Sequence, residues 1–472
     1  MSSYASRERV GLAAAFATSL LLGAILAREG LGLAAFVAAF PLAVALLVTS
    51  GHRALLAGVI LALTIPTWWT IGTPQAAIFR IASGLAFVPL VLGPWRMRWT
   101  VSDGLILVFV ADSFLSALFQ TAAPGVGRVA LNLFLPVAFY FAARALPSRM
   151  QRRAVAAAVT AITIGALTVI IERATGQVLF QDAQSYSWVP SNGGVFRPGG
   201  VYGSPPAASL VLAVGLLLGY SLRKGAGGWR RGALSFSTLA MTLALVLTFE
   251  RSGVIALAAG AVVYMLLIGL DARVILRYSI VAGLVAVAAV LAYPRVQATA
   301  TFQNGVLRPG TLSARTSIWQ EELPVVTSSA HTATIGVGFG ATVVARTAGT
   351  VPSELATHPR LISTSIHDQY LLILLEQGGI GLAIFLFFVG AATWRGVSSS
   401  LRTHDGLTVG MTAAVVAVLV ASITTTPMLD YSSWILSLLV LGLLVARTGS
   451  TTPVTARRTA SPRILSAADA RA

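Results

Sequence analysis

One histidine stands where a long hydrophilic stretch meets an apolar one, His367 in ISTSIHDQYLLILLEQGGIGLAIFL. Imidazole titrates near neutral pH, so a histidine at a membrane interface can remove the proton from a substrate hydroxyl group. Ser365 and Asp368 also resemble a helix-capping pair, in which case His367 would have no chemical role. The local sequence leaves both interpretations open.

Arginines form the second group of residues that could do chemistry. Arg251 lies in FERSG between two apolar runs, where an unpaired cation near hydrocarbon is costly. Pairing with Glu250, or extension to the interface, would explain it without a function. A guanidinium binds phosphate through two parallel N–H groups, so arginines at the membrane edge suit a lipid-linked phosphate or diphosphate. Attraction to anionic headgroups is the alternative. The arginines expected outside are Arg173, Arg197, Arg251, Arg295, Arg308, Arg315, Arg346 and Arg360.

Metal chemistry has no pattern to support it. The outer segments contain no Asp-x-Asp and no His-x-x-x-His, so we predict no metal and no cofactor. The chain has no cysteine, which excludes disulfides and thiolate sites. Arg80 lies inside an apolar run and Glu29 in a short outer loop; whether either belongs to a site stays open.

Composition indicates which elements must position these residues. Hydrophobic residues make up 56% of the 472 and charged residues 10%, whereas a soluble domain has roughly 25% charged. Apolar runs of ~16–20 residues between short polar breaks favour membrane helices over barrel strands. We therefore predict an all-α, polytopic transmembrane helix bundle with a large extracytoplasmic loop and about 12–14 spans, at 10–27, 31–49, 54–71, 76–93, 103–120, 127–146, 154–171, 207–222, 233–249, 253–270, 275–293, 370–393, 407–426 and 432–446.

The basic residues give these spans an orientation. Arginines recur in every second connection, and the short loops 72–75 and 427–431 contain none. Because cytoplasmic loops are enriched in arginine and lysine, we expect both termini in the cytoplasm. The predicted organisation is transmembrane helices over 1–293 with a smaller outer loop at about 172–206, a large extracytoplasmic loop over 294–369, C-terminal transmembrane helices over 370–447 and a disordered cytoplasmic tail over 448–472.

Several motifs occur in the order of a known family. They are IIERATG, FRPGGVYGSPPAASLVLAVGLLL, LTFERSG, LSARTSIWQEEL, IGVGFG and IHDQYLLILLEQGGIGL. The set resembles the bacterial O-antigen ligase and O-antigen polymerase superfamily, membrane glycosyltransferases of the GT-C type, over roughly residues 165–395. In LTFERSG the arginine precedes the serine, whereas the family pattern has the reverse order. The resemblance implies a GT-C-like helical fold.

The resemblance also implies a role for each matching residue. His367 would deprotonate the acceptor hydroxyl group and Asp368 would orient it. The donor diphosphate would be held by Arg197, Arg251 and Arg315, with Arg173 able to replace Arg197. The site would be shaped by Trp319, Tyr370 and Tyr202. The implied reaction is inverting and metal-independent, and moves a glycan from a polyprenyl-diphosphate carrier, such as undecaprenyl diphosphate, to a lipid or cell-envelope acceptor on the outer face of the bacterial cytoplasmic membrane.

Two alternatives stay open. A polysaccharide repeat-unit polymerase of the same superfamily would use the same histidine and arginines. A lipid-linked glycan transporter or flippase would share the helices and basic sites, although we find no inverted repeat. Nothing indicates a nucleic-acid partner. The sugars, linkage, acceptor and oligomeric state cannot be inferred from the sequence.

Overall fold

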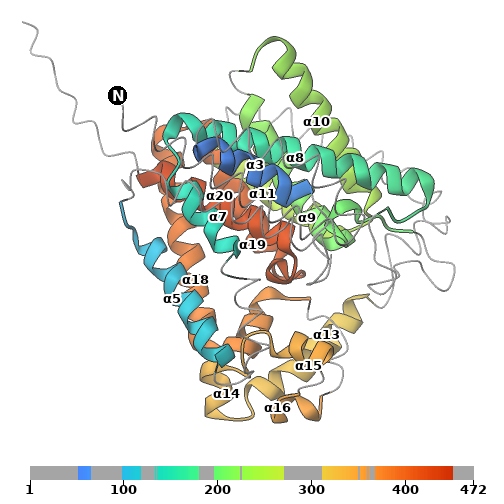
Figure 1. Cartoon of the computed structure of the whole chain (residues 1–472), viewed down its shortest axis with the longest axis vertical. Coiled ribbons are helices and arrows are strands. Elements are labelled where there is room, and N and C mark those ends of the chain that lie inside the picture. The colour runs from blue at the N-terminus through green and yellow to red at the C-terminus, as the bar shows by residue number, and fades with distance from the viewer. Residues whose placement is uncertain are drawn as a thin grey trace, which may run out of the picture.

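The computed structural model describes residues 51–64, 98–118, 133, 135–179, 196–223, 226–269, 311–348, 351–358, 361 and 367–449. Within these ranges the regular structure is helical, without strands (Figure 1). Five of the described helices are long and apolar enough to cross a membrane: α8 (Ser148–Thr175), α9 (Pro205–Arg223), α11 (Arg251–Ile268), α18 (Gln369–Thr403) and α20 (Tyr431–Gly449). The predicted polytopic helical fold is confirmed. The spans expected at 10–27, 31–49, 76–93 and 275–293 lie outside the described residues.

Helices α9, α20 and the shorter apolar helix α19 (Gly406–Ala421) are mostly buried within the bundle. Helix α3 (Gly51–Thr64) packs against α8, α5 (Val101–Ser116) against α18, α7 (Leu135–Arg144) against α20, and α10 (Gly228–Leu247) against α8 and α9. Small residues allow close helix contacts: a Cβ placed on Gly442 of α20 would lie 2.4 Å from the carbonyl oxygen of Tyr140 on α7. Large apolar side chains of α10 and α11 are exposed, among them Leu239 and Leu266. Surfaces of this kind suit contact with lipid.

The described residues before α18 include the helices α13 (Thr311–Val326), α14 (Ala330–Ile335), α15 (Ala341–Ala348) and α16 (Ser353–Ala356). They lie together at one end of the molecule in Figure 1. Their apolar residues share a second hydrophobic cluster with Leu372 and Leu375 of α18. We call α13–α16 the cap.

Helix α18 joins the cap to the bundle and is longer than the expected 370–393. It runs on through a polar turn to Thr403 and ends where His404 adopts a left-handed conformation. The helix is kinked at Gly378, which has φ 65° and ψ −168°. A Cβ there would lie 2.3 Å from the carbonyl group of Thr334 in the cap, so only glycine fits this contact.

The kink also fixes the cap to the bundle. The carbonyl oxygens of Leu375 and Glu376 accept hydrogen bonds of 2.9 Å from the backbone N–H groups of Val337 and Gly338. These carbonyls precede the non-helical residue, so the cap supplies the donors that a continuous helix would have provided. The position of the cap is therefore coupled to the shape of α18.

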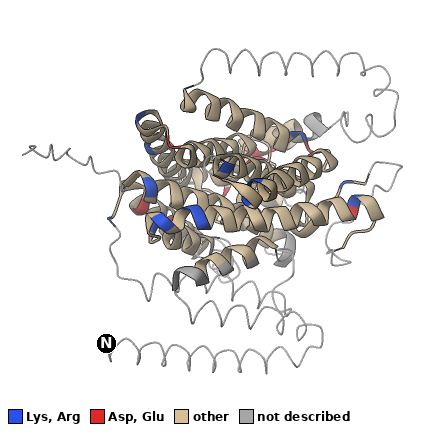
Figure 2. Ribbon diagram, turned by 90° about the horizontal axis from the view of Figure 1, so that it is seen from above, with Lys and Arg blue, Asp and Glu red and all other residues tan. Residues whose placement is uncertain are grey.

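Charged residues are few along the ribbon (Figure 2), and two ion pairs among them join helix ends. At the start of α5, Asp103 accepts hydrogen bonds from Tyr140 at 2.8 Å and from Arg144 at 2.8 and 2.9 Å. Between α18 and α19, Asp405 accepts one of 2.8 Å from Arg447. Such ion pairs hold helix ends in register at one side of the bundle, the side where the sequence predicts cytoplasm.

Candidate active site

The turn between α10 and α11 is the centre of an arginine cluster. Residues Thr248–Glu250 connect the helices, and Phe249 has φ 51°. A positive φ is unfavourable for an aromatic residue and persists only when the surroundings impose it. Here the imposing groups are arginines from two other segments.

Arg197 holds this turn from the inside. Its Nε donates to the carbonyl oxygen of Thr248 and its Nη2 to that of Phe249, both at 3.1 Å. Nη2 also forms a buried ion pair with Glu250, whose other oxygen accepts a 3.1 Å hydrogen bond from Ser252. The sequence offered Glu250 as a salt-bridge partner for its neighbour Arg251. In the structure Glu250 pairs with Arg197, which comes from a distant segment.

Arg173 and Arg251 complete the cluster. Arg173, in the last turn of α8, lies over the ring of Phe249 at 5.4 Å and donates to the carbonyl oxygen of Phe196 at 3.2 Å. Arg251 begins α11 and is exposed. Among the described residues, its side chain makes no hydrogen bond or ion pair. The structure therefore brings Arg173, Arg197 and Arg251 to one turn.

His367 and Asp368 lie where the chain enters α18. His367 is half-buried. Asp368 is the N-cap, and its Oδ1 accepts from the backbone N–H groups of Tyr370 at 2.8 Å and Leu371 at 3.0 Å. Burial raises the pKa of Asp368, and the two amide hydrogen bonds offset part of this rise. Asp368 thus has the capping role, whereas Ser365 lies outside the described residues. His367 directly precedes this N-cap.

A loop between α19 and α20 lies near residues that follow His367 and Arg197 in the sequence. The backbone N–H of Gln369 donates to the carbonyl oxygen of Ser422 at 2.8 Å. The side-chain oxygen of Gln369 accepts from the backbone N–H of Met428 at 2.9 Å. Farther along this loop Asp430 lies close enough to Tyr202 to affect it: burial raises the pKa of the Tyr202 hydroxyl, and the Asp430 charge adds to the rise. Tyr202 belongs to the segment that carries Arg197, so the loop lies near that segment as well as near the start of α18.

The remaining predicted residues have different surroundings. Tyr202 is buried, and its hydroxyl has no hydrogen-bond partner among the described residues. The hydroxyl of Tyr370 donates to the carbonyl oxygen of Leu419 at 2.8 Å, which fixes α18 to α19. Trp319 lies on α13 of the cap, with a buried Nε1 that lacks a partner in the described part of the chain. The backbone of Arg315 belongs to the same helix.

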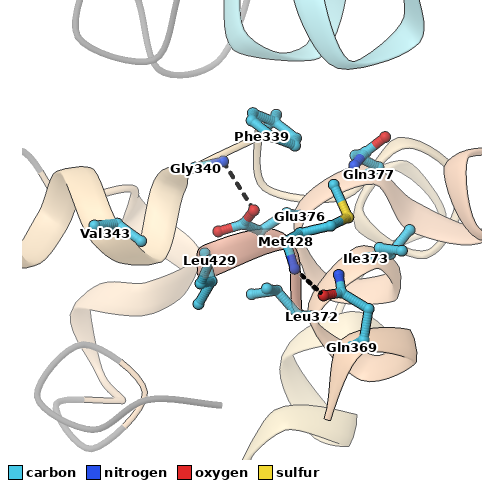
Figure 3. A pocket seen from close by; sticks show the side chains of 10 residues that line it. All are labelled: Phe339, Gly340, Val343, Gln369, Leu372, Ile373, Glu376, Gln377, Met428 and Leu429. Carbon is cyan, nitrogen blue, oxygen red and sulfur yellow. Dashed lines mark hydrogen bonds between the residues drawn. The ribbon is translucent and has the colours of Figure 1, made fainter. Parts of the chain in front are cut away.

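Sequence reasoning missed three acidic residues near the predicted site. Glu376 is buried in α18 and accepts from the backbone N–H of Gly340 at 2.9 Å (Figure 3). It also accepts from the Thr342 hydroxyl at 2.7 Å. Glu322 is buried beneath α13, and Glu172 near the end of α8. The signal for Glu376 was a carboxyl group inside an apolar run, which in a membrane protein suggests a function.

Burial raises the pKa of Glu322 to about 8, and the charges of Asp368 and Glu376 add to the rise. Both carboxyl oxygens of Glu322 lack a hydrogen-bond partner among the described residues. At neutral pH the protonated form is therefore favoured, which removes the cost of a buried, unpaired charge.

Comparison with known proteins finds a family that matches part of the chain. Residues 236–386 match the family described as O-antigen ligase. The predicted resemblance to that superfamily is confirmed, and the matched segment contains Arg251, Arg315, Trp319, His367 and Tyr370. No curated protein matches the chain. A solved chain from "Structural coordination of polymerization and crosslinking by a peptidoglycan synthase complex" is 17% identical, with 75% of this chain and 98% of that chain covered and a TM-score of 0.41.

Proposed function

Because residues 236–386 match the O-antigen ligase family, we propose that this membrane protein is a glycosyltransferase. It moves a glycan from a polyprenyl-diphosphate carrier to a hydroxyl group of a lipid or cell-envelope acceptor, on the outer face of the cytoplasmic membrane. A repeat-unit polymerase is the second candidate, since the same site would serve an acceptor that is itself a growing glycan.

The convergence of three arginines on the Thr248–Glu250 turn carries this proposal. Arg173, Arg197 and Arg251 come from separate segments, and the described ion pairs give Arg197 alone a carboxylate partner. Arg251 also begins an 18-residue helix, whose N-terminus favours anions. Developing negative charge on a departing diphosphate would be stabilised there by donors already in place.

His367 supplies the other half of the reaction. The imidazole removes the proton from the acceptor hydroxyl while its oxygen attacks the anomeric carbon. The bond from that carbon to the diphosphate oxygen breaks, and the polyprenyl diphosphate leaves with the electron pair. Attack opposite the leaving group inverts the anomeric centre. Arg315 and Trp319, on the cap helix α13, would contact the diphosphate and the sugars respectively.

Glycan transfer in liposomes tests the proposal, with a polyprenyl-diphosphate glycan, candidate acceptors and excess chelator. We expect the wild type to transfer and His367→Ala to lose at least ~100-fold, within the usual contribution of a general base. His331→Ala is the matched control, because this exposed histidine lies on α14 of the same cap. It should retain activity.

The products separate the candidates. One glycan per acceptor supports a ligase, and a ladder of increasing length supports a polymerase. Donor movement across the bilayer without a new glycosidic bond would replace both with a transporter. Wild-type turnover by His367→Ala would show that another residue acts as the base.

Replacing arginine by lysine tests the diphosphate site. Arg251→Lys keeps the positive charge but loses the planar pair of donors, so we expect a rise in the donor KM of about tenfold, near the ~1.4 kcal/mol of one charge-assisted hydrogen bond. An unchanged donor KM would mean that Arg251 contributes only general charge.

A further inference from the structure

A buried carboxylate joins two parts of the chain beside the arginine cluster. Glu172, in the last turns of α8, is only 1% exposed. Its Oε1 accepts from the backbone N–H of Leu179 at 3.1 Å. Its Oε2 accepts from Gly199 at 3.2 Å and from Gly200 at 2.7 Å. One side chain thus holds the chain as it leaves α8 and again where it returns to the bundle.

The returning segment fits this carboxylate closely. Gly200 has φ 55°, and a Cβ there would lie 2.5 Å from Thr168 Oγ1. A Cβ on Gly199 would lie 2.7 Å from the backbone nitrogen of Ser204. The backbone N–H of Val201 donates to Thr168 Oγ1 at 3.2 Å. Residues 199–201 are therefore fixed on α8 mainly by three amide donors.

These contacts determine where two arginines lie. Arg197 is two residues before Gly199 in FRPGG, and Pro198 between them restricts the backbone. Arg173 follows Glu172 and donates to the carbonyl oxygen of Phe196. The last turns of α8 thus bind the returning segment on both sides of Arg197, through Glu172 and Arg173. Arg197 in turn binds the Thr248–Glu250 turn, so the position of α8 fixes the position of that turn.

We propose that Glu172 is a positioning residue for the diphosphate site, which joins residues 179 and 199–200 so that Arg197 and Arg173 meet at the α10–α11 turn. This inference deepens the proposed function and rests on it for the identity of the ligand. Glu172 itself does not touch the donor, because its oxygens are buried on backbone amides. Displacing bound groups by ~1 Å can cost ~100-fold in rate, so the alignment matters to the reaction.

The test compares Glu172→Gln and Glu172→Ala with the wild type in nanodiscs. Binding of glycan-free polyprenyl diphosphate and amide exchange of residues 199–201 are measured beside glycan transfer. We expect affinity to fall at least tenfold in Glu172→Ala, with an intermediate loss in Glu172→Gln because its amide oxygen still accepts one pair of donors. The KM for the acceptor should stay unchanged, since the arginines bind the donor.

Asp405→Asn is the control for a merely structural effect. Asp405 also anchors a helix connection through its carboxylate, but at the opposite end of α18 from His367. This variant should lose stability without losing affinity for polyprenyl diphosphate.

Four outcomes decide the matter. Weaker binding with faster exchange at 199–201, in the order Ala, Gln, wild type, supports the positioning role. Faster exchange with unchanged binding reduces Glu172 to a structural contact and overturns it. If the wild type binds polyprenyl diphosphate with an affinity that depends on Glu172, but transfers no glycan, the proposed function is refuted and the inference is kept. A wild type that binds no polyprenyl diphosphate refutes both.

Discussion

Replacing Glu322 by glutamine should remove the pH dependence of cap docking. Glu322 lies in α13, is fully buried, and its oxygens have no hydrogen-bond partner among the described residues. Its pKa is raised from 4.5 to about 8, first by burial and then by the charges of Asp368 and Glu376. The docked cap is therefore more stable when Glu322 holds a proton, a state that glutamine mimics without titrating.

The direction and the size of the pH effect on cap docking follow from the linkage between proton binding and docking. Between pH 4.5 and about 8 the docked cap binds a proton that an undocked, solvated Glu322 has released. The stabilisation is complete below pH 4.5 and is lost as pH rises through about 8, so docking weakens across this window and is constant above it. At about 1.4 kcal/mol per pH unit, the whole window is worth at most about 5 kcal/mol.

Thiol labelling can measure this, because the chain has no cysteine. Val325 on α13 is 2% exposed and Leu323 is 47% exposed. Val325→Cys reports opening of the cap, and Leu323→Cys corrects for the reactivity of the thiol itself. The ratio of the two labelling rates should rise with pH, by up to about tenfold per unit, and level off above about 8.

Two variants in the Val325→Cys background decide the interpretation. Glu322→Gln should give a flat profile. Glu321→Gln should keep the wild-type slope, because this neighbour is partly exposed and lies 3.8 Å from His358. An unchanged slope in Glu322→Gln, or its loss in Glu321→Gln, would refute the assignment of the titration to Glu322.

Three further predictions concern the contacts around the site and at the other end of the bundle. Glu250→Gln leaves the buried cation of Arg197 without its counter-ion, and we expect a loss of about 3–5 kcal/mol in the free energy of unfolding, measured by thermal or denaturant unfolding in detergent. Gly378→Ala places a methyl group against Thr334 at a positive φ; amide exchange at 337–338 should accelerate, and transfer should fall at least about tenfold if the cap must be docked. Burial alone would raise the pKa of Asp405, but hydrogen bonds, the one from Arg447 foremost, lower it to about 2. Its stabilisation is present above pH ~4 and should be lost as pH falls toward 2, a dependence that calorimetry should find absent in Asp405→Asn.

The fold class could be predicted because a membrane-spanning helix is a continuous apolar run, which is visible in the sequence itself. The sequence also singled out Arg173, Arg197 and Arg251, which the structure brings to one turn, because an arginine in an expected outer segment departs from the charge rule for loops; their place on the outer side stays a prediction. It could not predict the partners. Arg197 pairs with Glu250 across 53 positions, whereas local reasoning offered Glu250 to Arg251. The length of α18 was also underestimated, because the helix continues to Thr403 after the hydropathy signal ends.

The cluster combines two kinds of arginine, and under the proposed function this division would let it bind a diphosphate that arrives and leaves. Arg197 is neutralised by Glu250 and fixed by two carbonyl groups, so it keeps the turn in shape when the donor is absent. Arg251 is exposed at the start of α11, so it can engage a diphosphate without first breaking a described ion pair. Arg173, shared between a ring and a carbonyl group, is intermediate. A site made only of free arginines would repel itself when empty, and one made only of paired arginines would have little charge left to offer.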